Sequence, residues 1–223
     1  MGFAVGVDLG READHSTIAV ARDGAHDQLY VVHLHRFALG TSYLDVVDGV
    51  MEIVSDPRLQ TDGRPPVLAV DQTGVGAAVT DLLLDRGLAF YAVTITATGK
   101  AKVHDAEGGR VSVRVTKREL IEALAAPLRA GRLKVAPRLR WGSALAEELL
   151  TFRRKQNERT GHVRWEHERA TDKDDLILAT ALACWAASAE PGAGRSLPER
   201  TWIGSSPRGC SARNERSESC SNR

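Results

Sequence analysis

Apolar positions along the chain change their spacing several times, and each change predicts an element. Residues 3–9 form a short apolar run that ends in Asp-Leu-Gly, as a buried strand does. Strand-like runs at 17–21 and 29–37 are joined by the turn-rich segment RDGAHDQ, so we expect the first three strands to be antiparallel. Helical spacing follows over 43–54 and stops before an Asp-Pro pair.

The middle of the chain alternates strands and helices. The segment PPVLAVDQTG predicts a second buried strand, followed by a helix that stops at Gly87 and by a strand over 90–95. The segment TKRELIEALAAPLRAG begins with a capping box made by Thr116 and Glu119. We expect Pro127 to kink or shorten that helix.

The last patterned segments complete the predicted architecture. They are a short strand over 133–136, a helix over 143–152, a strand pair near 156–166 and a helix from Asp172 to about residue 189. Asp172 and Asp175 have the spacing of a capping box at the start of this final helix, with Asp in place of the usual Glu. Strands first, then strand–helix alternation, predict an α/β fold with a mixed sheet flanked by helices.

Length and composition indicate one main domain. The chain has 223 residues, 43% of them hydrophobic and 26% charged, as in an ordinary soluble globular protein. We expect a single domain over 1–190. Of the last 33 residues, 191–223, 20 are Ser, Gly, Pro or Arg without an apolar period, which predicts a disordered tail.

Several classes of protein do not fit the sequence. No stretch approaches the roughly 20 apolar residues of a membrane span, and no signal peptide is visible, so we expect a cytoplasmic protein with no membrane partner. The three cysteines have neither metal-site nor disulfide spacing, and Cys184 lies in an apolar run that predicts a core position.

Positive charge is concentrated between Gly99 and Arg140. This stretch has eleven Lys and Arg residues against four acids, a net charge of +7 within a chain whose formal charge is +1. Such a cluster is compatible either with a polyanionic partner or with an ordinary solvated surface.

Two predicted strands end in a carboxylate. Asp8 and Asp71 each close an apolar run and are followed by glycine within three residues. Burying an unpaired charge is costly, so the repeated pattern favours a functional role. The alternative is an aspartate that forms a turn by bonding its own backbone two residues on.

A third acidic group precedes the final helix, where Asp174 and Asp175 stand next to each other. Carboxylates converging from two strands and a helix would make an oxygen-only site, which suits Mg²⁺ or Mn²⁺. Two such ions can activate water and stabilise the leaving oxygen of a phosphodiester. The basic stretch would then bind the DNA backbone.

Five separated segments resemble the nuclease domain of phage terminase large subunits, over about residues 3–188. They are GVDLGREADHSTIAV, AVDQTGVGAAVTDLLLDRG, TKRELIEALAAPLRAGRLKVA, LAEELLTFR and DKDDLILATALACW. The resemblance implies an RNase H-like fold and an endonuclease that cuts viral DNA during packaging, with Mg²⁺ or Mn²⁺ held by acidic residues.

Matched position by position, the resemblance implies Asp8, Asp71 and Asp175 as catalytic residues, with Asp8, Asp71, Asp174 and Asp175 as metal ligands. Asp175 is favoured over Asp174 because it directly precedes the buried helical run. The supporting turn and strand positions are Asp14, Thr17, Thr73, Gly74 and Gly76, and the candidate DNA-binding residues are Lys100, Lys102, Arg114, Lys117 and Arg118.

Two features depart from the family pattern. Many relatives have a histidine before the paired acids, where this chain has Lys173, and His167 is a weak substitute. No GxxxxGK[ST] motif occurs, since ATGKA at 97–101 lacks the first glycine and the final Ser or Thr. We therefore expect double-stranded DNA as partner inside a bacterial host cell, with any motor ATPase, small subunit or portal supplied separately.

Three other functions remain open from the sequence. VGVDLG and DQTGVG resemble the phosphate loops of actin-like or sugar-kinase ATPases, although those proteins generally need more residues than the patterned part of this chain. A Holliday-junction resolvase would share the fold and the acidic site. A degenerate domain that binds DNA or a packaging partner without cutting is the third alternative.

Overall fold

A computed structural model describes residues 2–10, 14–74, 77–99, 102–156, 163–167 and 174–188. The strands are β1 (Phe3–Asp8), β2 (Thr17–Asp23), β3 (Leu29–Arg36), β4 (Val67–Asp71), β5 (Phe90–Thr96), β6 (Lys102–Glu107), β7 (Arg110–Thr116), β8 (Leu133–Val135), β9 (Phe152–Gln156) and β10 (Val163–His167). The α-helices are α1 (Tyr43–Val54), α2 (Ala77–Asp85), α3 (Lys117–Arg129), α4 (Gly142–Thr151) and α5 (Asp175–Ser188), and two 3₁₀ turns cover Ala25–Asp27 and Pro57–Leu59.

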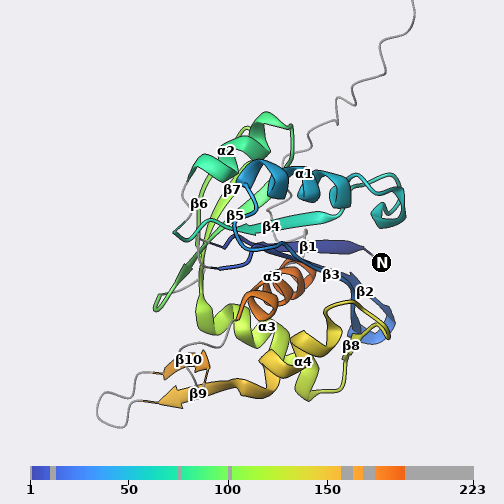
Figure 1. The fold of residues 1–223 in the computed structure, drawn as a ribbon, viewed down its shortest axis with the longest axis vertical. Helices are drawn as coiled ribbons and strands as arrows, with labels where there is room; N and C mark the ends of the chain where they lie inside the picture. Colours follow the sequence, from blue (N-terminus) through green and yellow to red (C-terminus); the bar gives the residue numbers. More distant parts are fainter. Residues whose placement is uncertain are drawn as a thin grey trace, which may run out of the picture.

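Eight strands form one mixed sheet in the order β6-β7-β5-β4-β1-β2-β3-β8. Strands β1, β2 and β3 are antiparallel neighbours, while β4, β5 and β7 extend the sheet from β1 in parallel. Strands β9 and β10 form a separate hairpin (Figure 1). The predicted α/β fold, with three antiparallel strands followed by parallel ones, is confirmed.

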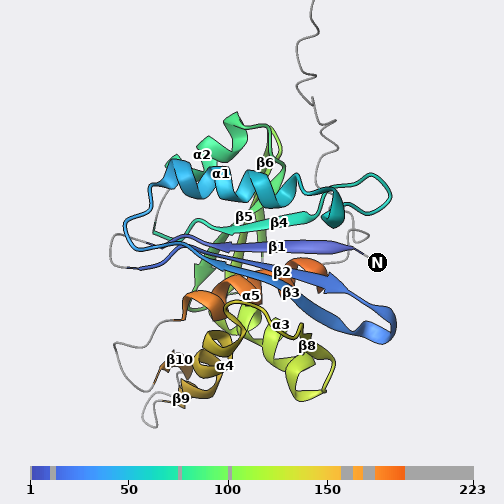
Figure 2. The same cartoon turned by 45° about the vertical axis from the view of Figure 1, so that its right-hand side comes forward.

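Helices α1 and α2 cover one face of the sheet, as Figure 2 shows. The apolar spacing of α1 directs Val46, Val47, Val50 and Val54 into the core on this face. They pack with alternate residues of the central strands, such as Val5 and Val7 of β1, because successive strand side chains point to opposite faces.

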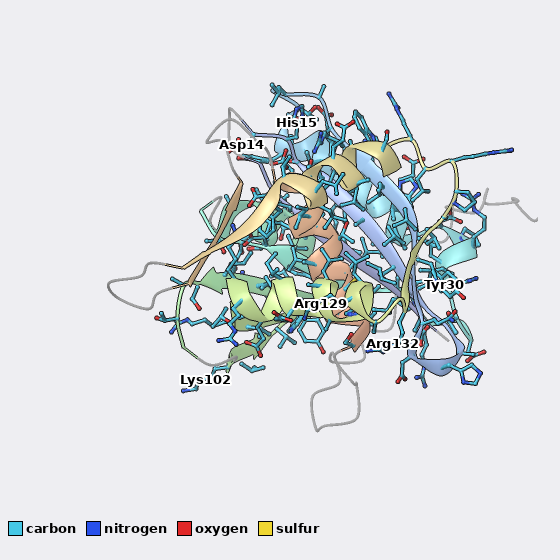
Figure 3. The ribbon with its side chains drawn as sticks, turned by 90° about the horizontal axis from the view of Figure 1, so that it is seen from below. Asp14, His15, Tyr30, Lys102, Arg129 and Arg132 are labelled. Atoms are coloured by element: carbon cyan, nitrogen blue, oxygen red, sulfur yellow. The ribbon has the colours of Figure 1, made fainter. Side chains whose placement is uncertain are left out.

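Helix α5 packs on the opposite face, with α3 and α4 on either side of it (Figure 3). Most of α5 is buried, because it lies under the sheet and between two other helices. Gly6 of β1 makes the close approach possible: a Cβ atom there would lie 2.1 Å from the carbonyl oxygen of Ala179 and 2.4 Å from the backbone nitrogen of Ala183. Any side chain at residue 6 would push α5 away from β1.

The structure corrects two expectations about elements. Strands β6 and β7 were not predicted, although valines at 111, 113 and 115 give β7 the period of a half-buried strand. Strand β7 lies inside the sheet, paired with β5 and β6. The expected start of the last helix at Asp172 was wrong, since α5 begins at Asp175 and Asp174 precedes it outside the helix.

Other local predictions have mixed outcomes. Thr116 accepts a hydrogen bond from the backbone N–H of Glu119, which confirms the predicted cap of α3, and Pro127 lies in the last turn of that helix. Cys184 is buried, as expected. Asp172, Lys173 and the tail over 191–223 lie outside the described residues. No helix within the described ranges is long and apolar enough to cross a membrane.

Candidate acidic active site

Asp8 and Asp71 end two neighbouring parallel strands. The register of β1 and β4 pairs Val7 with Val70, so the two aspartates follow at the same level. The carboxyl ends of parallel strands meet at one edge of a sheet, which brings both acids together there. Asp8 is 8% exposed and Asp71 is 7% exposed, so both are buried carboxylates.

Asp175 reaches the same edge through α5. It is the first residue of that helix and is 5% exposed. Thr17, which pairs with Asp8 across β1 and β2, donates a hydrogen bond of 2.8 Å from Oγ1 to the carbonyl oxygen of Asp175. The start of α5 is therefore joined to the strand position directly beside Asp8.

The electrostatics of Asp8 reflect this grouping of acids. Burial raises the pKa of Asp8 well above its ordinary value, and the charges of Asp71, Asp175 and Asp174 raise it further. The charge of Lys117 opposes these effects. Carboxylates that perturb one another within a buried site are typical of functional centres.

Asp71 also forms a local turn. Its Oδ1 accepts a hydrogen bond of 2.7 Å from the backbone N–H of Thr73, the arrangement that a turn-forming aspartate makes. Burial raises the pKa of Asp71, while the hydrogen bonds from Thr73 and the charge of Lys117 lower it. Gly74 has φ of +89°, which glycine adopts without strain. Asp71 therefore forms a local turn with its own backbone and also lies beside Asp8.

Lys117 lies at the edge of the sheet that carries the acids. It is the first residue of α3, directly after β7, and its Nζ is 2.9 Å from Oδ2 of Asp174. Because its charge also acts on Asp8 and Asp71, Lys117 influences acids from both strands and from the start of α5. In the sequence, Lys117 stands out only as part of the basic stretch.

Glu148 of α4 was missed from the sequence. It is buried, pairs with Arg36, and lies beside the start of α5, where its Oε2 accepts hydrogen bonds from the backbone N–H groups of Leu176 and Ile177. Burial raises its pKa to about 7 against the opposing effects of Arg36 and the Ile177 N–H. The available signal was its position three residues after the buried Leu145, on the apolar side of α4.

The structure describes four of the five positions matched as supporting residues, and their supporting role stays a prediction. Thr17 begins β2, Asp14 lies in a bend before it, and Oγ1 of Thr73 accepts a hydrogen bond from the Ile95 N–H at 2.7 Å. Asp14 lines a small pocket of about 190 Å³ with Gly10, Ser16 and Tyr43 among others. Gly76 lies outside the described residues.

The candidate DNA-binding residues fall near the acidic edge. Lys102 of β6 pairs in register with Arg114 of β7, and Arg118 follows Lys117 at the start of α3. Figure 3 shows Lys102 and Asp14 toward one end of the molecule, with Arg132 toward the other. The basic stretch is therefore divided between two ends of α3. Lys100 lies outside the described residues.

The acidic residues suit a hard divalent cation by their chemistry. Three buried carboxylates offer oxygen ligands. Burial first, and repulsion by the neighbouring acids second, raise the pKa of Asp8, and a bound cation would relieve both effects. Within the part of the chain that the structure describes, no three His, Cys, Asp or Glu side chains are already gathered as a coordination shell. The ligand roles of Asp8, Asp71, Asp174 and Asp175 stay a prediction.

Comparison with known proteins gives a likeness in structure only. No protein-family model matches the sequence, and no curated protein matches it. The large terminase nuclease of thermophilic phage G20c is similar with a TM-score of 0.59 and 20% identity, covering 82% of this chain and 80% of that one. The HK97 bacteriophage large terminase has a TM-score of 0.50 and 13% identity.

The shared region covers 83% of this chain and 39% of the HK97 protein. The nuclease domain of the SPP1 large terminase with bound Mn has a TM-score of 0.49 and 12% identity, covering 82% of this chain and 85% of that domain. The likeness to the G20c and HK97 proteins, at 20% and 13% identity, establishes a common fold. The chain therefore has the RNase H-like fold of terminase large-subunit nuclease domains, as its sequence motifs predict.

Proposed function

We propose that this protein is a divalent-metal-dependent endonuclease that hydrolyses phosphodiester bonds of double-stranded DNA. One observation carries the proposal: Asp8, Asp71 and Asp175 come from segments far apart in the sequence and are buried at one edge of the sheet. The fold of terminase nuclease domains supports the same interpretation.

The acids would hold the metal. Asp8, Asp71 and Asp175, with Asp174 beside them, are the residues that would hold Mg²⁺ or Mn²⁺, with two ions expected. When bound, such ions supply a Lewis acid and an activated water for in-line displacement at phosphorus. The strands β1 and β4 keep Asp8 and Asp71 at neighbouring positions, and the Thr17 hydrogen bond keeps the start of α5 beside them.

The cationic side chains near the site would bind the DNA backbone. Lys102, Arg114 and Arg118 lie on or next to strands that end at the acidic edge, and Arg114 and Arg118 are exposed. Lys and Arg contacts to phosphate provide affinity without reading sequence. They would hold the duplex against the repulsion of the carboxylates.

The biological setting is part of the proposal. The fold likeness to viral large terminases supports cleavage of viral DNA during packaging as the role of this nuclease. In that setting a motor ATPase, a small subunit and a portal are the expected partners.

Nicking of supercoiled plasmid tests the proposal. The wild-type protein should nick the plasmid with Mn²⁺ or Mg²⁺ and not with EDTA, and Asp8→Asn or Asp71→Asn should abolish nicking. Asp48→Asn is a matched control, because Asp48 is an exposed acid on α1 paired with Arg86. Unchanged nicking by Asp8→Asn, with folding verified by thermal melting, would refute the assignment.

The same protein preparations separate the alternatives. Preferential cutting of four-way junctions over linear duplex would indicate a resolvase. Binding of ATP without nicking would favour the ATPase interpretation, and salt-sensitive DNA binding without nicking under any divalent metal would favour a non-cutting domain.

A further inference from the structure

The start of α5 is capped in an unusual way. Asp174 occupies the N-cap position, because it precedes the helix and its carbonyl oxygen accepts the first helical hydrogen bond, from Leu178 N–H at 2.9 Å. An aspartate at an N-cap ordinarily turns its own carboxylate back onto the N–H groups two and three residues later. In α5 those N–H groups belong to Leu176 and Ile177.

A different helix satisfies these two N–H groups. Oε2 of Glu148, on α4, accepts hydrogen bonds from Leu176 N–H at 3.1 Å and from Ile177 N–H at 3.2 Å. The carboxylate of Asp174 is therefore not used for capping. Its Oδ2 pairs instead with Nζ of Lys117, and its charge acts on Asp8.

Arg36 makes the buried position of Glu148 possible. Its guanidinium bonds Oε1 of Glu148, so that each carboxylate oxygen of Glu148 has a partner. The same guanidinium is 4.0 Å from Oδ2 of Asp175 and stacks over the Trp141 ring at 5.4 Å. Both side chains of the pair are almost wholly buried, at 13% and 10% exposed. The pair is held between β3, α4 and the start of α5.

We infer that Glu148 is a positioning residue: by capping α5 from a neighbouring helix, it keeps the carboxylate of Asp174 in the acidic cluster beside Asp175. The inference rests on the proposed function in so far as that cluster binds a divalent cation. Without Glu148, Asp174 would take over the cap of its own helix and withdraw from Lys117 and the cluster.

A double-mutant cycle in the metal-free protein tests the capping step directly. Asp174→Ala should change the unfolding equilibrium little in the wild type, because the Asp174 side chain makes no cap there. In the Glu148→Ala background it should raise the unfolding equilibrium constant roughly fivefold, the value of an N-cap that Asp174 has acquired. Urea denaturation of the four proteins measures this coupling.

Mn²⁺ affinity tests the positioning step. Glu148→Ala should weaken Mn²⁺ binding about tenfold by calorimetry, because the Asp174 carboxylate leaves the cluster, a loss of about 1.4 kcal/mol. Glu147→Ala is the matched control, since Glu147 is the exposed neighbour on the same helix, and it should leave the affinity unchanged.

Two conservative variants distinguish the effect of the length of the Glu148 side chain from the effect of its charge. Glu148→Gln keeps an acceptor oxygen at the same distance and should retain Mn²⁺ affinity within about threefold. Glu148→Asp keeps the charge for Arg36 but is one methylene shorter, so it should weaken Mn²⁺ binding and couple to Asp174→Ala. If Glu148→Ala does not fold, the Glu148→Asp cycle replaces it.

The outcomes distinguish this inference from the proposed function. An additive cycle, or unchanged Mn²⁺ affinity in Glu148→Asp, overturns the role of Glu148 even if the wild-type protein binds Mn²⁺ and cuts DNA. Absence of Mn²⁺ binding by the wild type instead contradicts the proposed function. In that case the double-mutant cycle in the metal-free protein still decides which residue caps α5.

Discussion

Thr17 donates a hydrogen bond of 2.8 Å to the main-chain carbonyl oxygen of Asp175, a residue 158 positions later in the sequence. Thr17 also pairs in register with Asp8, so this one side chain ties the start of α5 to the strand that carries the first acid. Thr17 itself is fully buried. The hydrogen bond directly links two distant parts of the acidic edge.

Thr17→Val should weaken both stability and metal binding. Valine keeps the shape and strand preference of threonine but leaves the buried carbonyl without that donor, at a cost of about 1–3 kcal/mol. Urea denaturation and Mn²⁺ calorimetry measure the two effects. Thr180→Val removes another buried threonine hydroxyl, on α5, and should leave Mn²⁺ affinity unchanged. Equal losses of affinity in both variants would contradict a specific role for Thr17.

The pKa of Asp8 predicts how stability depends on pH. Its folded-state pKa lies above the unfolded value of about 3.9, so between the two the native state holds a proton that the unfolded chain has lost. Asp8 therefore adds to the free energy of unfolding in full below about pH 4. This stabilisation is lost as pH rises through the folded-state pKa of Asp8. Thermal melts of metal-free protein between about pH 4.5 and 8 measure this slope.

Added Mn²⁺ should reverse that trend. A cation replaces the proton on the carboxylates, so stabilisation by Mn²⁺ should grow with pH over the same window. Asp8→Asn does not titrate and should flatten both profiles. Profiles of the wild type and Asp8→Asn that run parallel, with and without Mn²⁺, would exclude Asp8 as the group responsible.

The division of the basic stretch predicts which cations bind DNA. Lys102→Ala with Arg114→Ala should weaken duplex binding and reduce the salt dependence of affinity, by about 0.9 in the log–log slope for each phosphate that the protein no longer neutralises. Arg129→Ala with Arg132→Ala is the control, because these residues pair with Glu122 and Asp27 away from the acidic edge. Fluorescence anisotropy at several salt concentrations measures both. Larger losses of affinity in the control pair would assign the DNA surface to the other end of α3.

Gly6→Ala should be strongly destabilising. Its Cβ would meet the backbone of α5 at Ala179 and Ala183, which cannot move without shifting the helix, and such overpacking costs about 1–3 kcal/mol or more. Gly142→Ala is the matched control, since its Cβ would meet its nearest neighbour, Leu139 Cβ, at 3.5 Å, an ordinary contact. Chemical denaturation compares the two, and equal tolerance would mean that α5 is not held as closely as the structure has it.

Much of the architecture follows from local sequence. Alternation and apolar runs identify β1, β2, β3, β4 and β5, because a strand buried on one face needs alternate apolar residues and a strand buried on both faces needs a continuous apolar run. The cap of α3 at Thr116 was also readable, because an N-cap bonds an N–H only three residues away. The aspartates that end β1 and β4 can also be identified from local sequence, because each is a charged residue directly after an apolar run.

Other features depend on contacts between distant segments. Strand β7 has alternating valines, but its place inside the sheet comes from pairing with β5 and β6, which no local pattern specifies. Lys117 belongs to a charged run in the sequence, yet its position after β7 places it against Asp174. Glu148 and Arg36 are 112 residues apart and meet only because α4 and β3 both pack beside the start of α5.

The sequence by itself therefore determined the order of most strands and helices and the two acids that end β1 and β4, because periodicity and capping act over a few residues. Only the tertiary structure decided where α5 begins, that Glu148 caps it, and that the side chain of Lys117 lies among the acids. Those outcomes depend on hydrogen bonds and charges between segments that the chain brings together only when the sheet and its helices pack.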